Sequence, residues 1–128
     1  KILLLIMGPL FISVIFMVSG CKTDNPSNTH YTEFVIQIDS ITHPNTVKLG
    51  SSLQIKFYGT IGPDGCYSFS RFDGGVEGKT INITVYGRKL DENVCTQQVQ
   101  YLSGATLNVN QLDTGRYILH LHQAFPPD

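Results

Sequence analysis

Two histidines near the end of the 128-residue chain have the spacing of metal ligands. One residue separates His120 from His122 within an alternating stretch, so both imidazoles are expected on the outward face of one strand, about 7 Å apart. Such a pair can chelate copper or zinc, and His30 or His43 could supply further ligands. Because two ligands do not complete a site, we expect an exposed, solvated pair. A periplasmic copper- or zinc-binding protein is the alternative.

The sequence contains none of the motifs that mark common catalytic centres. There is no Gly-x-Ser-x-Gly elbow, no His-Glu-x-x-His pair and no glycine-rich phosphate loop. Four carboxylates fall in predicted turns, namely Asp64, Asp73, Asp91 and Glu92. Turn formation explains these residues without a calcium ion, which needs six or more converging oxygens. We therefore expect a protein without enzymatic activity and without a cofactor.

Tyr58 and Tyr86 are the candidate binding residues, because alternation places both on outward faces among amide and hydroxyl side chains. Exposed tyrosines in such surroundings can contact sugars or protein partners, so an envelope protein or a glycan is the candidate partner. The favoured interpretation is that they only cover the open side of a sheet. The formal net charge of −1 argues against nucleic acid or an anionic membrane surface as an electrostatic partner.

The first twenty residues have the features of a secretory signal. Lys1 precedes a stretch from Ile2 to Val18 in which 14 of 17 residues are apolar and none is charged. The stretch ends in Val18-Ser19-Gly20-Cys21, which resembles the lipobox of bacterial lipoproteins. The resemblance implies cleavage before Cys21 and acylation of that cysteine, whose acyl chains would anchor the protein in a lipid bilayer. The alternative is an uncleaved membrane span in which Cys21 has no such role.

These features divide the chain into three expected parts: a signal peptide over 1–20, a lipidated cysteine and polar tether over 21–30, and a folded domain over 31–128. About ten flexible residues reach roughly 17 Å, so the domain is expected close to the membrane. Lys22 follows the cysteine, where an aspartate would resemble the inner-membrane retention signal of enteric lipoproteins. We therefore expect a cell-envelope location, in the outer membrane rather than the inner one.

If Cys21 carries lipid, Cys66 and Cys95 remain as the other two cysteines. A chain with a signal peptide folds in an oxidising compartment, where an even remainder most often forms disulfides. The loop-entropy model gives roughly 3.5 kcal/mol for closing a ring of about 30 residues. The alternative is a pair of thiolates on a metal, although no Cys-x-x-Cys spacing supports it.

Alternation of apolar and polar residues continues through most of the chain after Tyr31. Strict period two places each apolar set on one face of a half-buried strand, and no stretch has the spacing of a surface helix. Seven short strands in about 100 residues predict an all-β fold, a single antiparallel sandwich. The expected inward residues on the five clear strands are Phe34, Ile36 and Ile38; Leu53, Ile55 and Phe57; Ile81, Ile83 and Val85; Ala105, Leu107 and Val109; and Tyr117, Leu119 and Leu121.

Two further stretches have weaker patterns. Residues 66–72 could bury either Tyr67 and Phe69 or Cys66 and Phe72, and residues 95–101 are expected to bury Val99 and Tyr101 as a candidate edge strand. Turn residues separate the expected strands at 62–65, 73–75, 91–93 and 103–104.

Asp113-Thr114-Gly115-Arg116-Tyr117 resembles the tyrosine corner of immunoglobulin-like domains. This resemblance implies that residues 31–128 form an immunoglobulin-like sandwich in which the Tyr117 hydroxyl bonds to nearby backbone. The alternative is a glycine turn followed by a core tyrosine. Segments between Ser51 and His122 are also similar to small secreted bacterial sandwiches, a resemblance that implies no activity. We expect a noncatalytic, lipid-anchored binding or structural module, and a protease inhibitor on the same scaffold is a further alternative.

Overall fold

A computed structural model describes residues 30–91 and 94–124. The predicted signal segment, Cys21 and most of the predicted tether lie outside the described residues. Within the described part, no helix is both long and apolar enough to cross a membrane.

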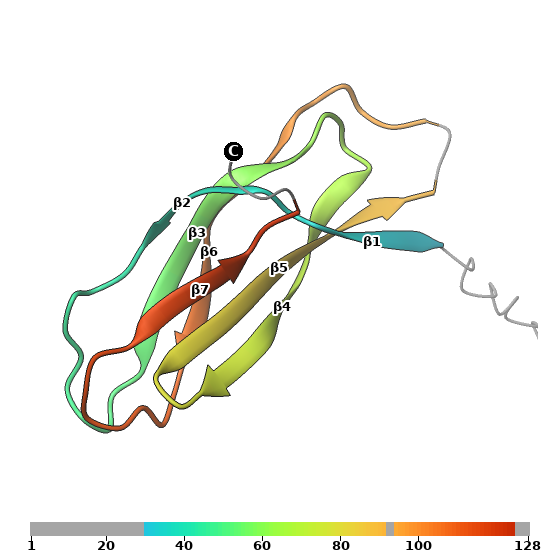
Figure 1. Ribbon diagram of the computed structural model, residues 1–128. Helices are drawn as coiled ribbons and strands as arrows, with labels where there is room; N and C mark the ends of the chain where they lie inside the picture. The colour runs from blue at the N-terminus through green and yellow to red at the C-terminus, as the bar shows by residue number, and fades with distance from the viewer. Residues whose placement is uncertain (1–29, 92–93, 125–128) are drawn as a thin grey trace, which may run out of the picture.

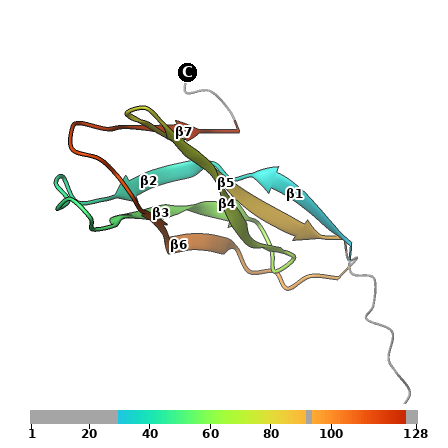
Figure 2. The same ribbon diagram turned by 90° about the horizontal axis from the view of Figure 1, so that it is seen from below.

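The described chain forms seven β-strands in two layers (Figures 1 and 2). Strands β1, β4, β5 and β7 make a four-stranded sheet, and β2, β3 and β6 make a three-stranded sheet. This arrangement confirms the all-β sandwich. The strands are β1 (Tyr31–Val35), β2 (Ile38–Thr42), β3 (Leu53–Gly62), β4 (Tyr67–Glu77), β5 (Thr80–Leu90), β6 (Gln100–Val109) and β7 (Ile118–His122).

Strand β5 organises the four-stranded sheet. Strand β4 pairs along one edge, while β1 and β7 share the other: β1 pairs with residues 86–90 and β7 with residues 80–84. The β5–β7 pairing is parallel and all other described pairings are antiparallel, so one strand departs from the predicted arrangement. Sheets of four and three strands match a constant-type immunoglobulin domain, but β2 and β7 lie in the opposite sheets from their counterparts there.

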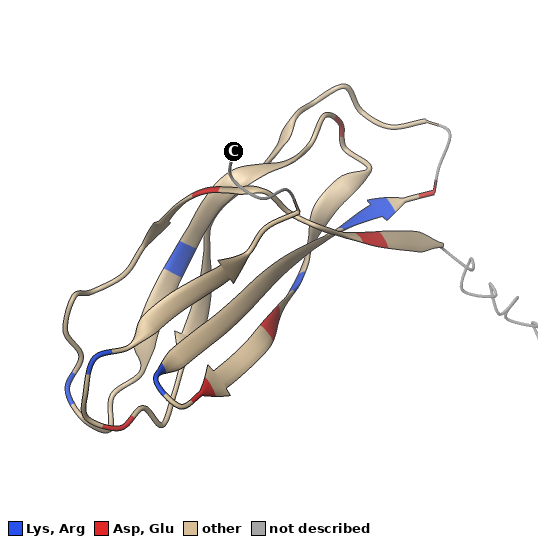
Figure 3. Ribbon diagram, viewed as in Figure 1, with Lys and Arg blue, Asp and Glu red and all other residues tan. Residues whose placement is uncertain are grey.

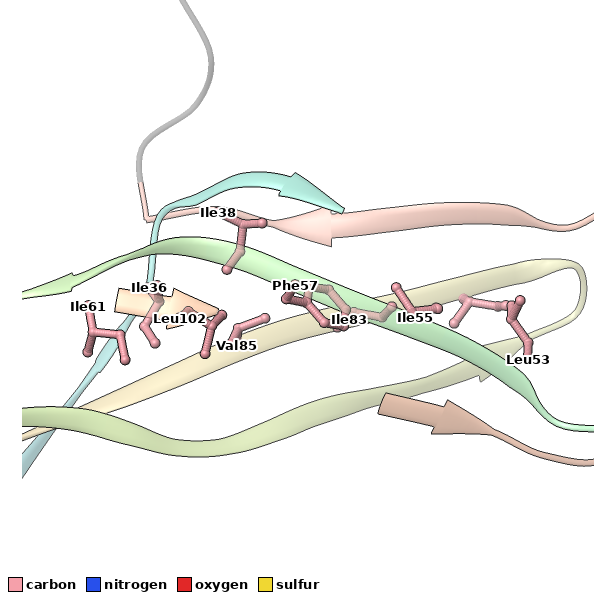
Figure 4. Close-up of a cluster of buried hydrophobic side chains, with 10 residues drawn as sticks. Ile36, Ile38, Leu53, Ile55, Phe57, Ile61, Ile83, Val85 and Leu102 are labelled. Carbon is pink, nitrogen blue, oxygen red and sulfur yellow. The ribbon is translucent and has the colours of Figure 1, made fainter. Parts of the chain in front are cut away.

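The core lies between the sheets and comes mainly from β3 and β5 (Figure 4). Alternation predicted the inward faces of both strands correctly, since Leu53, Ile55 and Phe57 are buried, as are Ile81, Ile83 and Val85. Side chains buried this completely contribute about 1.5–3 kcal/mol each. Tight burial of these two strands therefore stabilises the centre of each sheet.

The first predicted strand is divided between the two sheets. Phe34 lies in β1 and Ile38 in β2, and the chain crosses from one layer to the other around Ile36. The Ile36 amide donates to the Val85 carbonyl oxygen at 2.8 Å, which holds the crossing against β5. Apolar residues of both strands face the same core, so the alternation of apolar and polar residues continues from β1 into β2. The sequence therefore does not show where the chain passes from one sheet to the other.

Two predicted turns lie inside strands instead. Gly74 is part of β4 with a φ of 141°, and Gly104 is part of β6 with a φ of 77° beside a register shift. Both backbone conformations suit glycine, and a glycine within a strand commonly accompanies a bulge. The tight connection between β4 and β5 is instead made at Gly78, whose φ is 59°.

The two weaker stretches differ from their expected strands. A register shift between Phe69 and Arg71 in β4 allows both Phe69 and Phe72 to pack on the core, which combines the two alternatives for that stretch. The expected strand over 95–101 is wrong, because β6 begins at Gln100 and Leu102 is the buried residue.

Candidate functional site

The two predicted metal ligands lie where alternation placed them, with His120 and His122 exposed on the outer face of β7. The Nδ1 atom of His120 lies 3.1 Å from the Asn82 side-chain oxygen. Among the described residues, no third histidine, cysteine or carboxylate groups with the pair to form a set of metal ligands. His30 pairs with Asp91, and His43 contacts the Pro44 carbonyl oxygen, so neither completes the site.

The two candidate binding tyrosines lie in different layers. Tyr58 belongs to β3 in the three-stranded sheet and Tyr86 to β5 in the four-stranded sheet, and both are half-buried. The Arg71 guanidinium lies 4.2 Å from the Tyr86 ring centroid, so a cation–π contact occupies that ring. The two tyrosines therefore lie on different sheets and do not share one face, and their role in binding stays a prediction.

A disulfide joins Cys66 to Cys95, with 5.4 Å between their Cα atoms. It fastens the start of β4 to the segment that leads into β6. The backbone reinforces the link, because the Gly65 amide donates to the Thr96 carbonyl oxygen at 2.8 Å and the Cys66 amide donates to Asp64 Oδ1 at 2.9 Å. The predicted pairing is confirmed, and the two sulfurs bond to each other rather than to a metal.

The tyrosine corner is also confirmed. The Tyr117 hydroxyl accepts a hydrogen bond of 2.9 Å from the Asp113 amide and one of 3.2 Å from the Lys79 ammonium. The same ammonium donates to the Thr114 carbonyl oxygen at 2.8 Å and lies 4.6 Å from the Tyr117 ring centroid. Lys79 thus ties the 112–117 segment to the β4–β5 turn.

A groove of about 370 Å³ opens beside this corner, between residues 43–51 and residues 112–117. These segments meet at the end of the sandwich farthest from the start of β1, at the lower left of Figure 1. Its lining includes seven largely apolar side chains, those of Pro44, Val47, Leu49, Leu53, Leu112, Tyr117 and Leu119. The volume falls in the range of small-ligand sites. We call this end of the sandwich the distal end.

Two exposed cations stand beside this groove. Within the described chain, neither Lys48 nor Arg116 has an ion-pair or hydrogen-bond partner for its side chain. Figure 3 shows both basic and acidic positions around the distal end. The groove therefore offers an apolar lining with two cations, Lys48 and Arg116, and one carboxylate, Asp113, at its margin. Sequence patterning could not reveal the groove, because its two segments are more than sixty residues apart and neither shows a hydrophobic periodicity.

The ionisable groups with shifted pKa values lie in exposed surface pairs, away from this groove. Hydrogen bonds from the Ser70 hydroxyl and the Arg71 guanidinium lower the pKa of the Glu33 carboxyl, and Glu33 raises the pKa of Arg71. The hydrogen bond with His30 lowers the pKa of Asp91. These contacts connect β1 to β4 across β5 and fasten the start of β1 to the end of β5.

Comparison with known proteins yields one match. A family model described as the ORF11 beta-sandwich domain matches residues 53–122, which run from β3 through β7. No curated protein matches the chain. No solved structure matches it either. The family description names an architecture and no activity.

Proposed function

Because the chain belongs to the ORF11 beta-sandwich domain family, we propose that it is a noncatalytic binding module of a bacterial cell envelope, anchored by lipid on Cys21. The observation that carries the binding role is the distal groove with its two unpaired cations. It lies at the opposite end of the sandwich from Tyr31, where the tether would enter the domain.

The lipid anchor follows from the lipobox. Residues 22–29 separate Cys21 from His30, the first described residue. The predicted tether of about ten residues would reach about 17 Å, half the length of β5, whose eleven residues span about 36 Å. The tether would therefore hold the start of β1 near the bilayer and leave the distal groove facing away from it. Lys22 after the cysteine favours the outer membrane.

The noncatalytic role is supported by the electrostatics of the described surface. Catalytic groups are commonly brought to unusual pKa values by burial and charged neighbours within a cleft. Here the shifted groups belong to exposed pairs that hold strands together, and the groove residues Lys48 and Arg116 are solvent-exposed. An apolar lining with positive charge at its margin suits a partner that presents an apolar group beside a carboxylate or another anion.

Metabolic labelling tests the anchor. Cells that express the full chain are supplied with an alkyne analogue of palmitate, and the protein is compared with its Cys21→Ser variant. We expect label on the native sequence and none on the variant. Equal labelling of the two would refute lipidation at Cys21.

Capture from envelope extract tests the groove. The anchored protein is compared with Lys48→Glu and with Lys56→Glu, which makes the same change at an exposed position on the outer face of β3. A partner of the groove should be retained by the native chain and by Lys56→Glu, and lost with Lys48→Glu. Equal retention by both variants would exclude the groove as the binding site.

A further inference from the structure

The exposed large apolar side chains divide between the two ends of the sandwich. Eight such residues occur in the described chain, and each lies in a loop or within two residues of a strand end. Four belong to the distal end, namely Val47, Leu49, Val76 and Ile118. The other four belong to the end where β1 begins, which we call the proximal end, and are Tyr31, Val94, Val99 and Tyr101.

The proximal set is held together by covalent and backbone links. Tyr31 pairs with Leu90, whose amide donates to the Cys66 carbonyl oxygen at 2.9 Å. The disulfide then joins Cys66 to Cys95, next to Val94. Val94 is 85% exposed and Tyr101 is 65% exposed, so both present apolar surface to the surroundings. In Figure 1 this end lies at the upper right, where the chain enters the domain.

Positive charge accompanies this apolar surface. The Arg88 guanidinium lies 4.6 Å from the Tyr31 ring centroid, and the Lys89 ammonium lies 5.6 Å from that of Tyr67. Neither cation forms an ion pair within the described chain, although Arg88 acts electrostatically on Glu33 and Lys89 on Asp91. The Arg88 guanidinium also donates to the Ser68 hydroxyl at 3.1 Å. Both side chains are exposed, so external anions can reach them.

This combination matches the composition of membrane-interface surfaces. Tyrosines concentrate at the headgroup level of a bilayer, and Lys and Arg side chains close to an anionic lipid surface are attracted to it. This attraction acts within about a Debye length, so it depends on the local cations and not on the net charge of −1 for the whole chain. The chain that precedes the described residues limits the distance of this end from the anchor, because only residues 22–29 separate Cys21 from His30 and the predicted tether would reach about 17 Å. A lipid on Cys21 would therefore keep the proximal end within contact distance of the bilayer.

We infer that the proximal end rests on the lipid surface, with Val94 at the boundary between headgroups and acyl chains and with Arg88 and Lys89 against anionic headgroups. This inference rests on the proposed anchor at Cys21. It also fixes the orientation of the domain, since contact at the proximal end directs the distal groove away from the membrane.

Tryptophan fluorescence tests this contact with lipid. The native chain contains no tryptophan, so all tryptophan emission from a single-tryptophan variant comes from the introduced residue. Val94→Trp probes the proximal end, and Leu49→Trp is the matched control in a distal loop, where Leu49 is 69% exposed. The full-length lipidated proteins are incorporated into vesicles of phosphatidylethanolamine and phosphatidylglycerol with brominated acyl chains. Quenching should be several times stronger for Val94→Trp than for Leu49→Trp, with emission shifted to the blue.

Tyr101→Trp gives an independent reporter at the same end, in case a change beside Cys95 disturbs the disulfide. Its quenching should also exceed that of Leu49→Trp. Equal quenching at the two ends would overturn the contact with lipid. Brominated lipid that leaves the emission of both proximal reporters unchanged would also overturn it. So would shielding of these reporters by a protein partner in place of lipid. The mass of each preparation separates the two proposals: lipidated protein without proximal quenching overturns the contact alone, whereas unmodified Cys21 overturns both.

Discussion

Removal of the Tyr117 hydroxyl tests the link between the 112–117 segment and the β4–β5 turn. In Tyr117→Phe, the Asp113 amide loses its 2.9 Å acceptor and the Lys79 ammonium loses one at 3.2 Å. A net hydrogen bond contributes about 0.5–1.5 kcal/mol to the free energy of unfolding, and one to a charged group somewhat more. Water reaches both exposed donors after the change and offsets part of the loss. We therefore expect a destabilisation of about 1–2 kcal/mol.

Urea unfolding followed by circular dichroism measures this change. With an m-value of about 2 kcal/mol/M, the middle of the usual range, the midpoint should fall by roughly 0.5–1 M. The melting temperature should fall by about 4–8 °C for each kcal/mol in a domain of this size. Tyr58→Phe is the matched control, because its half-buried hydroxyl has no hydrogen-bond partner among the described residues. Equal destabilisation by both variants would refute a special role for the Tyr117 hydroxyl.

Three further predictions concern the disulfide, the core and the surface charges. Replacing both Cys66 and Cys95 with alanine should lower the free energy of unfolding by roughly 3.5 kcal/mol, and a loss below about 1 kcal/mol in urea unfolding would contradict this value. Phe57→Ala should cost about 3–5 kcal/mol, whereas Lys56→Ala on the outer face of the same strand should stay within about 0.5 kcal/mol by thermal unfolding. The pKa of Glu33 is lowered by folding, so the unfolded chain binds more protons and stability is lost as pH falls below the ordinary value of 4.5. Glu33→Gln should make that acid loss shallower in unfolding measured across pH, and an unchanged slope would contradict the assignment.

Sequence patterning predicted the inward residues well where strands are buried on one face. In β3 and β5, alternate residues meet the opposite sheet, so period two directly reports the fold. Period two does not report strand direction or partner, however. The parallel pairing of β7 with β5 and the crossing of the chain between β1 and β2 therefore left no signal in the sequence.

Glycine explains the misplaced turns. A glycine with positive φ serves a turn or a bulge equally well, and the choice depends on the partner strand. Gly74 pairs in regular register with Ile83, whereas Gly104 lies at the register shift between Phe57 and Tyr58, so the first continues a ladder and the second is a bulge. The local sequence does not indicate which strand pairs with either glycine.

The distal groove could not be predicted for the same reason, because its two walls meet only after the sheets have formed.

Local chemistry, by contrast, was predictable from short motifs. The Asp-x-Gly-x-Tyr spacing indicated the hydrogen bond between the Tyr117 hydroxyl and the Asp113 amide. An even number of cysteines beyond Cys21 indicated the pairing of Cys66 with Cys95. These features depend on residues that are adjacent in the chain or on the redox compartment, and neither requires knowledge of the topology.

The most direct test of the lipid-anchored account is intact mass spectrometry of the protein extracted from the membranes of a bacterial host. The account predicts a chain that begins at Cys21, with a diacylglyceryl group on its sulfur and an acyl group on its amine. A chain that retains residues 1–20, or one that carries an unmodified thiol at Cys21, would contradict it.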